Sequence, residues 1–190
     1  MRQSAPFSAI FLLLALVSGT AHAAGSGDGV SRWALFGQTG WAEADVSSYA
    51  IGAWHPLPWR AQWGGTSIRS YAEVTLSRWV ADDPAPAESR KFTQLGVAPV
   101  LRLQHVRAPR GLFLDVGIGA YLITPIYQHD SKRFGSAYNF GDQIAIGTRL
   151  GRTGRHEVSL RLQHFSNGGI KQPNPGENFL QARVLIRFAG

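Results

Sequence analysis

The segment LFLDVGIGAYL, residues 112–122, shows the alternation that decides the fold class. Its even positions, from Leu112 to Leu122, are all apolar, whereas its odd positions hold Phe113, Asp115, two glycines and Tyr121. Successive side chains of a β-strand point to opposite sides. The segment therefore predicts a strand with one apolar face and one face of mixed polarity.

The same two-residue period recurs along the rest of the chain. Apolar side chains alternate with polar or charged ones, for example around Val74, Leu160 and Val184. An even number of antiparallel strands is typical of bacterial outer-membrane barrels. We expect eight strands, which cover residues 32–39, 45–54, 65–80, 90–105, 111–124, 137–150, 155–166 and 177–188.

The beginning of the chain has the pattern of an export signal. Arg2 supplies positive charge, residues 10–17 form an apolar run, and Ala21-His22-Ala23 fits a small-x-small cleavage site. The apolar run is shorter than the ~20 residues that a transmembrane helix needs. We expect residues 1–23 to be a signal peptide and residues 24–190 to form a single β-barrel domain.

Two all-β architectures fit the alternation. A soluble sandwich would bury the apolar faces, whereas a lipid-embedded barrel would turn them outward and place Arg161, Gln163 and Arg183 in its lumen. Export and apolar faces about ten residues long favour an eight-stranded antiparallel transmembrane β-barrel of the outer membrane. Side chains fill the interior of such a small barrel, so we expect function on its outside or in its loops.

Composition narrows the chemistry. The formal net charge is +7, and for an exported protein anionic lipid headgroups or phosphorylated glycolipids are a better counter-charge than nucleic acid. The chain has no cysteine, which excludes disulfides, thiolate metal sites and a cysteine nucleophile. Its six histidines form no metal-ligand cluster in the sequence, so we expect neither a metal nor another cofactor. A homodimer is left open.

The segment HFSNGG, residues 164–169, holds the side chains that point to catalysis. His164 and Ser166 are two residues apart, so a strand places them on one face, where a histidine can take the proton of a serine nucleophile. Asn167 and the backbone near Gly169 offer hydrogen-bond donors for an oxyanion hole. Spacing alone leaves a non-catalytic alternative open, because a histidine at a strand end is often an interfacial polar residue.

An acid that orients the imidazole is the missing third member of this group. Glu177 is the nearest acid in sequence, on the far side of the loop that follows Ser166. Asp142 is the reserve candidate, because it shares parity with the outward residues of the preceding strand.

The run HFSNGGIKQPNPGEN, residues 164–178, resembles the signature of the PagL family of outer-membrane lipid A 3-O-deacylases. The likeness extends to GTSIRSYAEVTLSRW, LGVAPVLRLQH, GLFLDVGIGAY and YNFGDQIAIG. The resemblance implies Ser166 as nucleophile, His164 as general base, and Asn167 with the Gly169 N–H as oxyanion donors. The family's glutamate, counted from the serine without a gap, falls on Asn178, so Glu177 can serve only if the loop is shorter or a bulge re-aims it.

The leading hypothesis is therefore hydrolysis of the acyl ester at the 3-position of lipid A, the anchor of lipopolysaccharide, from the lipid-facing outside of the barrel. With both termini in the periplasm, the seventh strand delivers the site to the outer leaflet. Arg155, Lys171, Lys132 and Arg133 are candidates to meet lipid A phosphates. The alternatives are a non-enzymatic structural or adhesive barrel and an outer-membrane phospholipase.

Overall fold

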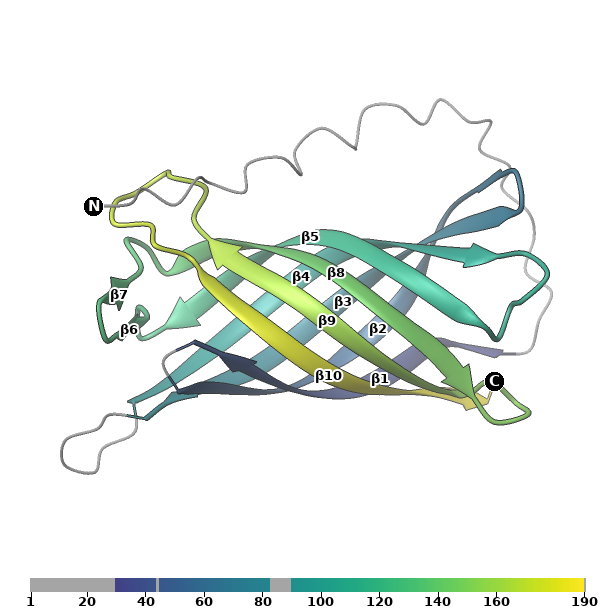
Figure 1. The fold of residues 1–190 in the computed structure, drawn as a ribbon, viewed down its shortest axis with the longest axis horizontal. Helices are drawn as coiled ribbons and strands as arrows, with labels where there is room; N and C mark the ends of the chain where they lie inside the picture. The colour runs from purple at the N-terminus through teal and green to yellow at the C-terminus, as the bar shows by residue number, and fades with distance from the viewer. Residues whose placement is uncertain (1–29, 44, 83–89, 190) are drawn as a thin grey trace.

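The chain folds as a closed antiparallel barrel in the computed structural model, which describes residues 30–43, 45–82 and 90–189 (Figure 1). The predicted signal peptide lies outside the described residues. The barrel order is β1-β10-β9-β8-β5-β4-β3-β2, and two further strands form a separate short hairpin. The barrel strands are β1 Val30–Ala42, β2 Val46–Trp63, β3 Thr66–Ala81, β4 Arg90–His105, β5 Leu112–Thr124, β8 Tyr138–Leu150, β9 His156–Ser166 and β10 Glu177–Ala189, and the hairpin is β6 Gln128–His129 with β7 Lys132–Arg133.

The alternation of the sequence becomes the two faces of the barrel wall. In β5, Leu112 and Leu122 are 68% and 56% exposed, whereas Phe113 and Tyr121 between them are each 3% exposed. The apolar face therefore points outward, which confirms the barrel and excludes the sandwich. Within the described residues no helix is long and apolar enough to span a membrane.

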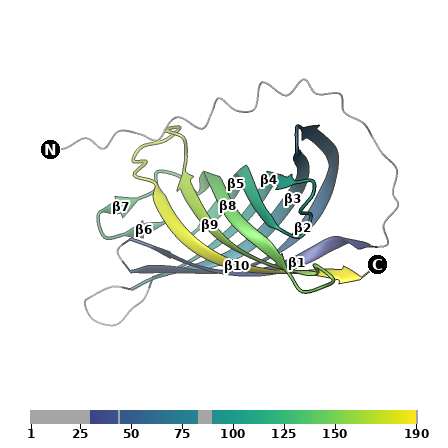
Figure 2. The same cartoon turned by 45° about the vertical axis from the view of Figure 1, so that its right-hand side comes forward.

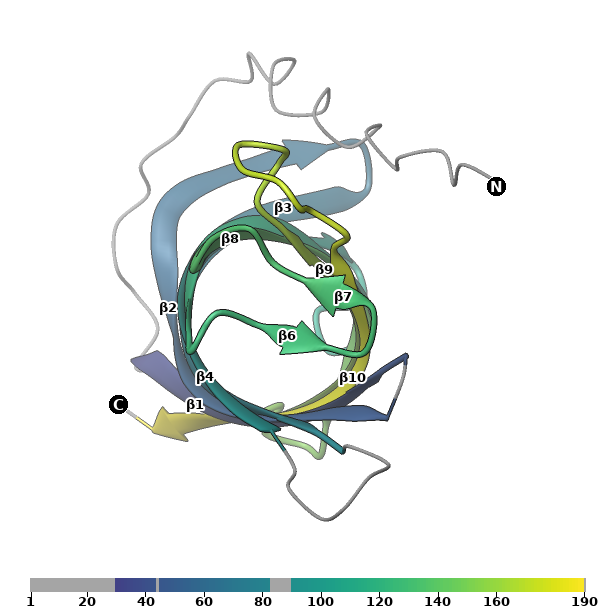
Figure 3. The ribbon, with the colours of Figure 1, turned by 90° about the vertical axis from the view of Figure 1, so that its left-hand side faces the viewer.

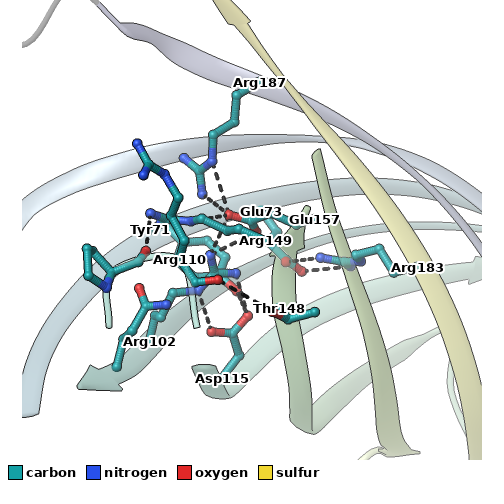
Figure 4. Close-up of polar contacts among 12 residues, drawn as sticks. Tyr71, Glu73, Arg102, Arg110, Asp115, Thr148, Arg149, Glu157, Arg183 and Arg187 are labelled. Carbon is teal, nitrogen blue, oxygen red and sulfur yellow. Dashed lines mark hydrogen bonds and ion pairs between the residues drawn. The ribbon is translucent and has the colours of Figure 1, made fainter. Parts of the chain in front are cut away.

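Charged side chains fill the middle of the lumen, and they pair with one another (Figure 4). Glu73 accepts hydrogen bonds from both Arg161 and Arg183. Arg102 bridges Asp115 and Glu157 with charged hydrogen bonds of 2.8 Å. Because a buried charge is costly unless it is paired, these networks make a polar interior compatible with folding.

Aromatic side chains close the end of the lumen near β6 and β7. Trp79 packs against Tyr127, Phe165 and Phe179 with ring centroids 4.6 to 5.4 Å apart. The β6–β7 hairpin lies across the barrel mouth beside the β9–β10 loop (Figure 3). Protein side chains therefore fill this end of the lumen.

The predicted strands match the observed ones closely except for the end of β2. The sequence predicted a strand that stops at residue 54, but β2 continues to Trp63, with a register shift between Pro56 and Arg60. A bulge lets a strand accommodate proline without a regular ladder bond. As a result the tip of the β2–β3 hairpin projects beyond the neighbouring strand ends (Figure 2).

Candidate active site

Three neighbouring strands build the candidate site on the outer wall of the barrel. Register pairs Asp142 of β8 with His164 of β9, and His164 with Asn178 of β10. The odd-numbered β9 neighbours Gln163 and Phe165 are buried in the lumen, so His164 points outward. Asp142, His164 and Asn178 therefore form one cross-strand row, which we call the polar row.

Ser166 is the last residue of β9 and lies one step beyond the polar row, toward the loop. It shares the outward face with His164, because the two are separated by two positions in a regular strand. Phe140 of β8 is its register partner. Within the described residues no hydrogen bond joins the Ser166 hydroxyl to the imidazole.

The imidazole of His164 is oriented from β10. Its Nδ1 lies 2.7 Å from Oδ1 of Asn178. Since an amide oxygen only accepts, this contact places the hydrogen of the neutral ring on Nδ1 and leaves Nε2 as an acceptor. Gly176, with φ of +71°, borders the other edge of the ring: a Cβ there would lie 2.5 Å from Cε1 and 3.1 Å from Nε2.

Glu177 does not reach His164, which corrects the expectation from sequence. It is fully buried on the lumen side, where it accepts hydrogen bonds of 2.8 Å from the Tyr127 hydroxyl and from Lys132 Nζ. Its register partner is Phe165, and β10 carries no bulge that would turn it outward. The regular two-residue period puts Asn178 beside the imidazole instead.

The groups expected to stabilise an oxyanion are engaged within the loop. The Asn167 side chain is fully buried and donates from Nδ2 to Ser136 Oγ and to the Lys171 carbonyl. The Gly169 N–H donates to Asn167 Oδ1 over 3.0 Å. Both donors therefore lie in the turn directly after Ser166, where their hydrogen bonds hold the loop together.

The wall on the side of the polar row away from the loop is apolar. The next outward row consists of Ile144, Leu162 and Leu180, which are 46%, 59% and 50% exposed. Two rows below the polar row, about 13 Å along the strands, an apolar groove of 710 Å³ begins, lined by residues that include Ile146 and Leu160. Neither His164 nor Ser166 lines this groove. The two side chains lie at the edge of the apolar outer wall, next to Leu162.

The cations expected to meet phosphates divide into two sets. Lys171 and Arg133 are exposed at the site end of the barrel. Lys132 instead donates to Glu177, and Arg155 lies in the β8–β9 turn at the opposite end, so neither fits that expectation. Within the described residues no group of three or more metal-binding side chains is present.

Comparisons with known proteins bear on the whole barrel. The family model described as "Lipid A 3-O-deacylase (PagL)" matches residues 48–187. The lipid A deacylase PagL of Bordetella bronchiseptica is 33% identical over 135 residues, which are 70% of this chain and 71% of that protein. The lipid A deacylase PagL of Pseudomonas aeruginosa is 28% identical over 121 residues, which are 62% of this chain and 66% of that protein.

Two solved structures share the fold. The outer membrane enzyme PagL superposes with a TM-score of 0.69 at 23% identity, covering 80% of this chain and 98% of its own. Neisserial surface protein A superposes with a TM-score of 0.52 at 11% identity, covering 85% of this chain and 100% of its own. The same barrel is thus found in an enzyme and in a surface protein, so the side chains on it must identify the function.

Proposed function

Because the chain belongs to the PagL family, we propose that it is a lipid A 3-O-deacylase, which hydrolyses the ester-linked acyl chain at the 3-position of lipid A. One observation carries the proposal: a serine and a histidine stand side by side on the outside of the barrel, at the border of an exposed apolar wall. A water-soluble substrate would not be expected to bind a serine and a histidine on the apolar outer wall of a barrel.

The outer leaflet of the outer membrane is the proposed location of the site. Strand β10 ends at the end of the barrel opposite to the β9–β10 loop (Figure 1). The turns at the end where β10 finishes are short, as at residues 64–65 and 151–155, whereas the other end carries the longer segments 125–137 and 167–176. Bacterial barrels keep short turns in the periplasm and longer loops outside, which supports an extracellular site.

The reaction begins with attack of Ser166 Oγ on the ester carbonyl carbon, while Nε2 of His164 takes the hydroxyl proton. The tetrahedral intermediate then collapses, the bond to the sugar oxygen breaks, and the imidazolium returns its proton to that oxygen. A water molecule, deprotonated by His164, attacks the acyl-serine. The products are the 3-hydroxyl of lipid A, a free fatty acid and the regenerated serine.

The Asn167 amide and the Gly169 N–H are the proposed oxyanion donors. Their partners in the structure are neutral oxygens of the loop. A hydrogen bond to a charged oxygen is roughly twice as strong as one between neutral groups, so an oxyanion can compete for these donors when it forms. Their stabilisation would then act mainly on the transition state, where it accelerates the reaction.

The surroundings of the pair suit a lipid with an anionic headgroup. The outward row of Ile144, Leu162 and Leu180 offers an apolar wall to acyl chains. Arg133 and Lys171 are exposed at the headgroup end, where they can attract phosphate. Together they support a substrate that lies in the membrane with its ester at the level of Ser166.

The decisive test is the mass of lipid A after incubation of lipopolysaccharide with purified protein in mixed micelles. Wild type should remove one 3-linked acyl chain. Ser166→Ala should lower the rate by more than about 10³-fold, because removal of a nucleophile leaves only binding and oxyanion contributions. Heat-modified migration on gels should show that the Ser166→Ala barrel is folded, since the hydroxyl makes no hydrogen bond with another described residue.

A second incubation with glycerophospholipid alone separates the proposal from a phospholipase. Loss of a fatty acid from phospholipid at a rate comparable to that from lipid A would contradict the proposed substrate. Activity of Ser166→Ala equal to that of wild type would contradict the proposed nucleophile. Unchanged lipid A with folded wild type would leave the non-enzymatic barrel as the better explanation.

A further inference from the structure

Two side chains of the polar row flank His164. One forms a hydrogen bond with the ring but is uncharged, and the other is an acid that forms no hydrogen bond with the ring. Asn178 touches the ring but carries no charge. Asp142 is an acid and faces His164 in register, but no hydrogen bond or salt bridge joins it to the ring or to any other described residue. In a serine–histidine site, one acid normally both orients the imidazole and stabilises its protonated form.

Asn178 can perform only the first of these tasks. Its Oδ1 accepts from Nδ1, which fixes the ring plane and leaves Nε2 free to accept a proton from Ser166. An amide oxygen carries only a partial charge, however. It therefore stabilises an imidazolium less than a carboxylate would at the same distance.

Asp142 is placed to perform the second task. Directly paired residues of antiparallel strands have Cβ atoms about 4.5 to 5.5 Å apart, so Asp142 lies beside His164 on the outward face of the wall. From β10 the ring meets uncharged Asn178, from the loop it meets Gly176, and from its own strand Ser166. Glu177 lies behind the barrel wall, so among the described residues Asp142 is the acid that faces the ring.

We propose that His164 is held between two positioning residues that divide the work of a single orienting acid: Asn178 fixes the ring and its tautomer, and Asp142 supplies the negative charge that stabilises the imidazolium. The inference rests on the proposed function, because it assigns roles around the same serine and histidine. It also explains how a member of this family can work with asparagine hydrogen-bonded to the imidazole.

The test moves the negative charge from the β8 side of His164 to its β10 side. Asp142→Asn removes the carboxylate on the β8 side, Asn178→Asp adds one on the β10 side, and the double variant moves the charge from one side to the other. For each protein kcat and KM for lipid A deacylation are measured from pH 4 to 10. Thr39→Ala, another outward polar position two rows below the polar row, is the control.

At low pH the activity falls because the general base must be neutral to accept a proton. The position of this acid limb of the pH profile therefore depends on the charge beside the base. Asp142→Asn should move the limb to lower pH by roughly 0.5 to 1 unit and lower kcat about tenfold, with little change in KM. Asn178→Asp should move it to higher pH. The double variant should return the limb toward wild type and recover most of the lost kcat. A residue with a merely structural role would not move the limb in either direction.

Asn178→Ala isolates the orienting role. It should lower kcat roughly 10- to 100-fold at all pH values with KM unchanged, whereas Asn178→Asp keeps an acceptor and retains activity. Wild-type kcat in Asn178→Ala, or an unmoved acid limb in Asp142→Asn, would overturn the division of roles. Ser166→Ala, assayed in parallel, separates the two failures: if it retains wild-type activity, the proposed function itself has failed.

Discussion

Polar groups inside the barrel and polar groups outside it differ in how completely they are paired. Glu73 in the lumen is bound by Arg161 and Arg183, and all three side chains are almost fully buried. On the outer wall, Ser166 makes no side-chain hydrogen bond with another described residue, and His164 keeps Nε2 free. The inner groups have used their bonding capacity for structure, whereas the outer groups retain unused bonding capacity, which the proposed reaction requires.

This difference explains why charge alone is a poor guide to the site. The lumen is rich in charged side chains, yet each of the major ones is paired with a group of opposite charge. A buried pair that is broken on one side costs more than the pair contributes, since the remaining charge is left unpaired. Substitutions on the inner face should therefore lower the stability of the barrel, whereas those beside His164 on the outer face should lower its activity.

The largest effect expected from the inner face is loss of stability. Glu73→Ala leaves Arg161 and Arg183 buried without their shared carboxylate, and we expect the free energy of unfolding to fall by about 3 to 5 kcal/mol. Urea unfolding of the folded barrel in detergent micelles measures this. Thr75→Ala, the next inward position of β3, is the control and should cost about 1 kcal/mol or less. A Glu73→Ala barrel as stable as the control would contradict the view that the lumen pairs hold the fold.

The sequence predicted the wall of the barrel better than the loops that stand on it. Strands could be predicted because the outward positions are mostly apolar over a long repeat, so the two-residue period remains visible despite single exceptions. The family resemblance and the eight-stranded barrel are both confirmed. The end of β2 was missed because Pro56 and Pro58 normally terminate a regular strand, and the bulge that accommodates them has no clear sequence signal.

The neighbours of the His164 imidazole were predicted less well than the strands. Glu177 was favoured because it is an acid, although an ungapped count from the serine already placed Asn178 at the family's position. Parity of the strand decides between the two neighbours, and it favours the uncharged one. The burial of Asn167 could not be predicted, because it depends on contacts with Ser136 and Lys171 that follow from the folded loops.

The second prediction concerns Gly176 on the outer face, where the imidazole of His164 leaves no space for a side chain. Gly176→Ala places a methyl group 2.5 Å from His164 Cε1 at a φ of +71°. We expect kcat/KM to fall about 10- to 100-fold because the ring must move, and the backbone strain to cost about 1 to 2 kcal/mol. Gly151→Ala, at φ of +73° in an open turn, has the same backbone strain without the collision. Equal activity of the two variants would show that the ring tolerates displacement.

The third prediction tests the inner position beside the site. Glu177→Gln keeps the shape of the side chain but removes the charge that binds Lys132. We expect a loss of about 1 kcal/mol in unfolding free energy and deacylation within roughly threefold of wild type, with no shift of its acid limb. Parallel urea and kinetic measurements on Glu177→Gln and Asn178→Ala compare the two neighbours directly. A shifted acid limb in Glu177→Gln would contradict the view that the Glu177 charge has no influence on His164.

The smallest effect concerns the pH dependence of the loop end, where Glu177 meets two titrating groups. Burial and the Glu177 charge raise the pKa of Tyr127. Burial lowers the pKa of Lys132, but the hydrogen bond and charge of Glu177 outweigh it, so this pKa lies above its ordinary value of 10.5. In both cases the folded state binds the proton more tightly, so this contribution to stability is complete at neutral pH and is lost as the pH rises above about 10. The drop in urea midpoint between pH 8 and pH 11 should therefore be smaller in a Tyr127→Phe, Lys132→Met double variant than in wild type; an equal drop would mean that other groups cause the alkaline loss.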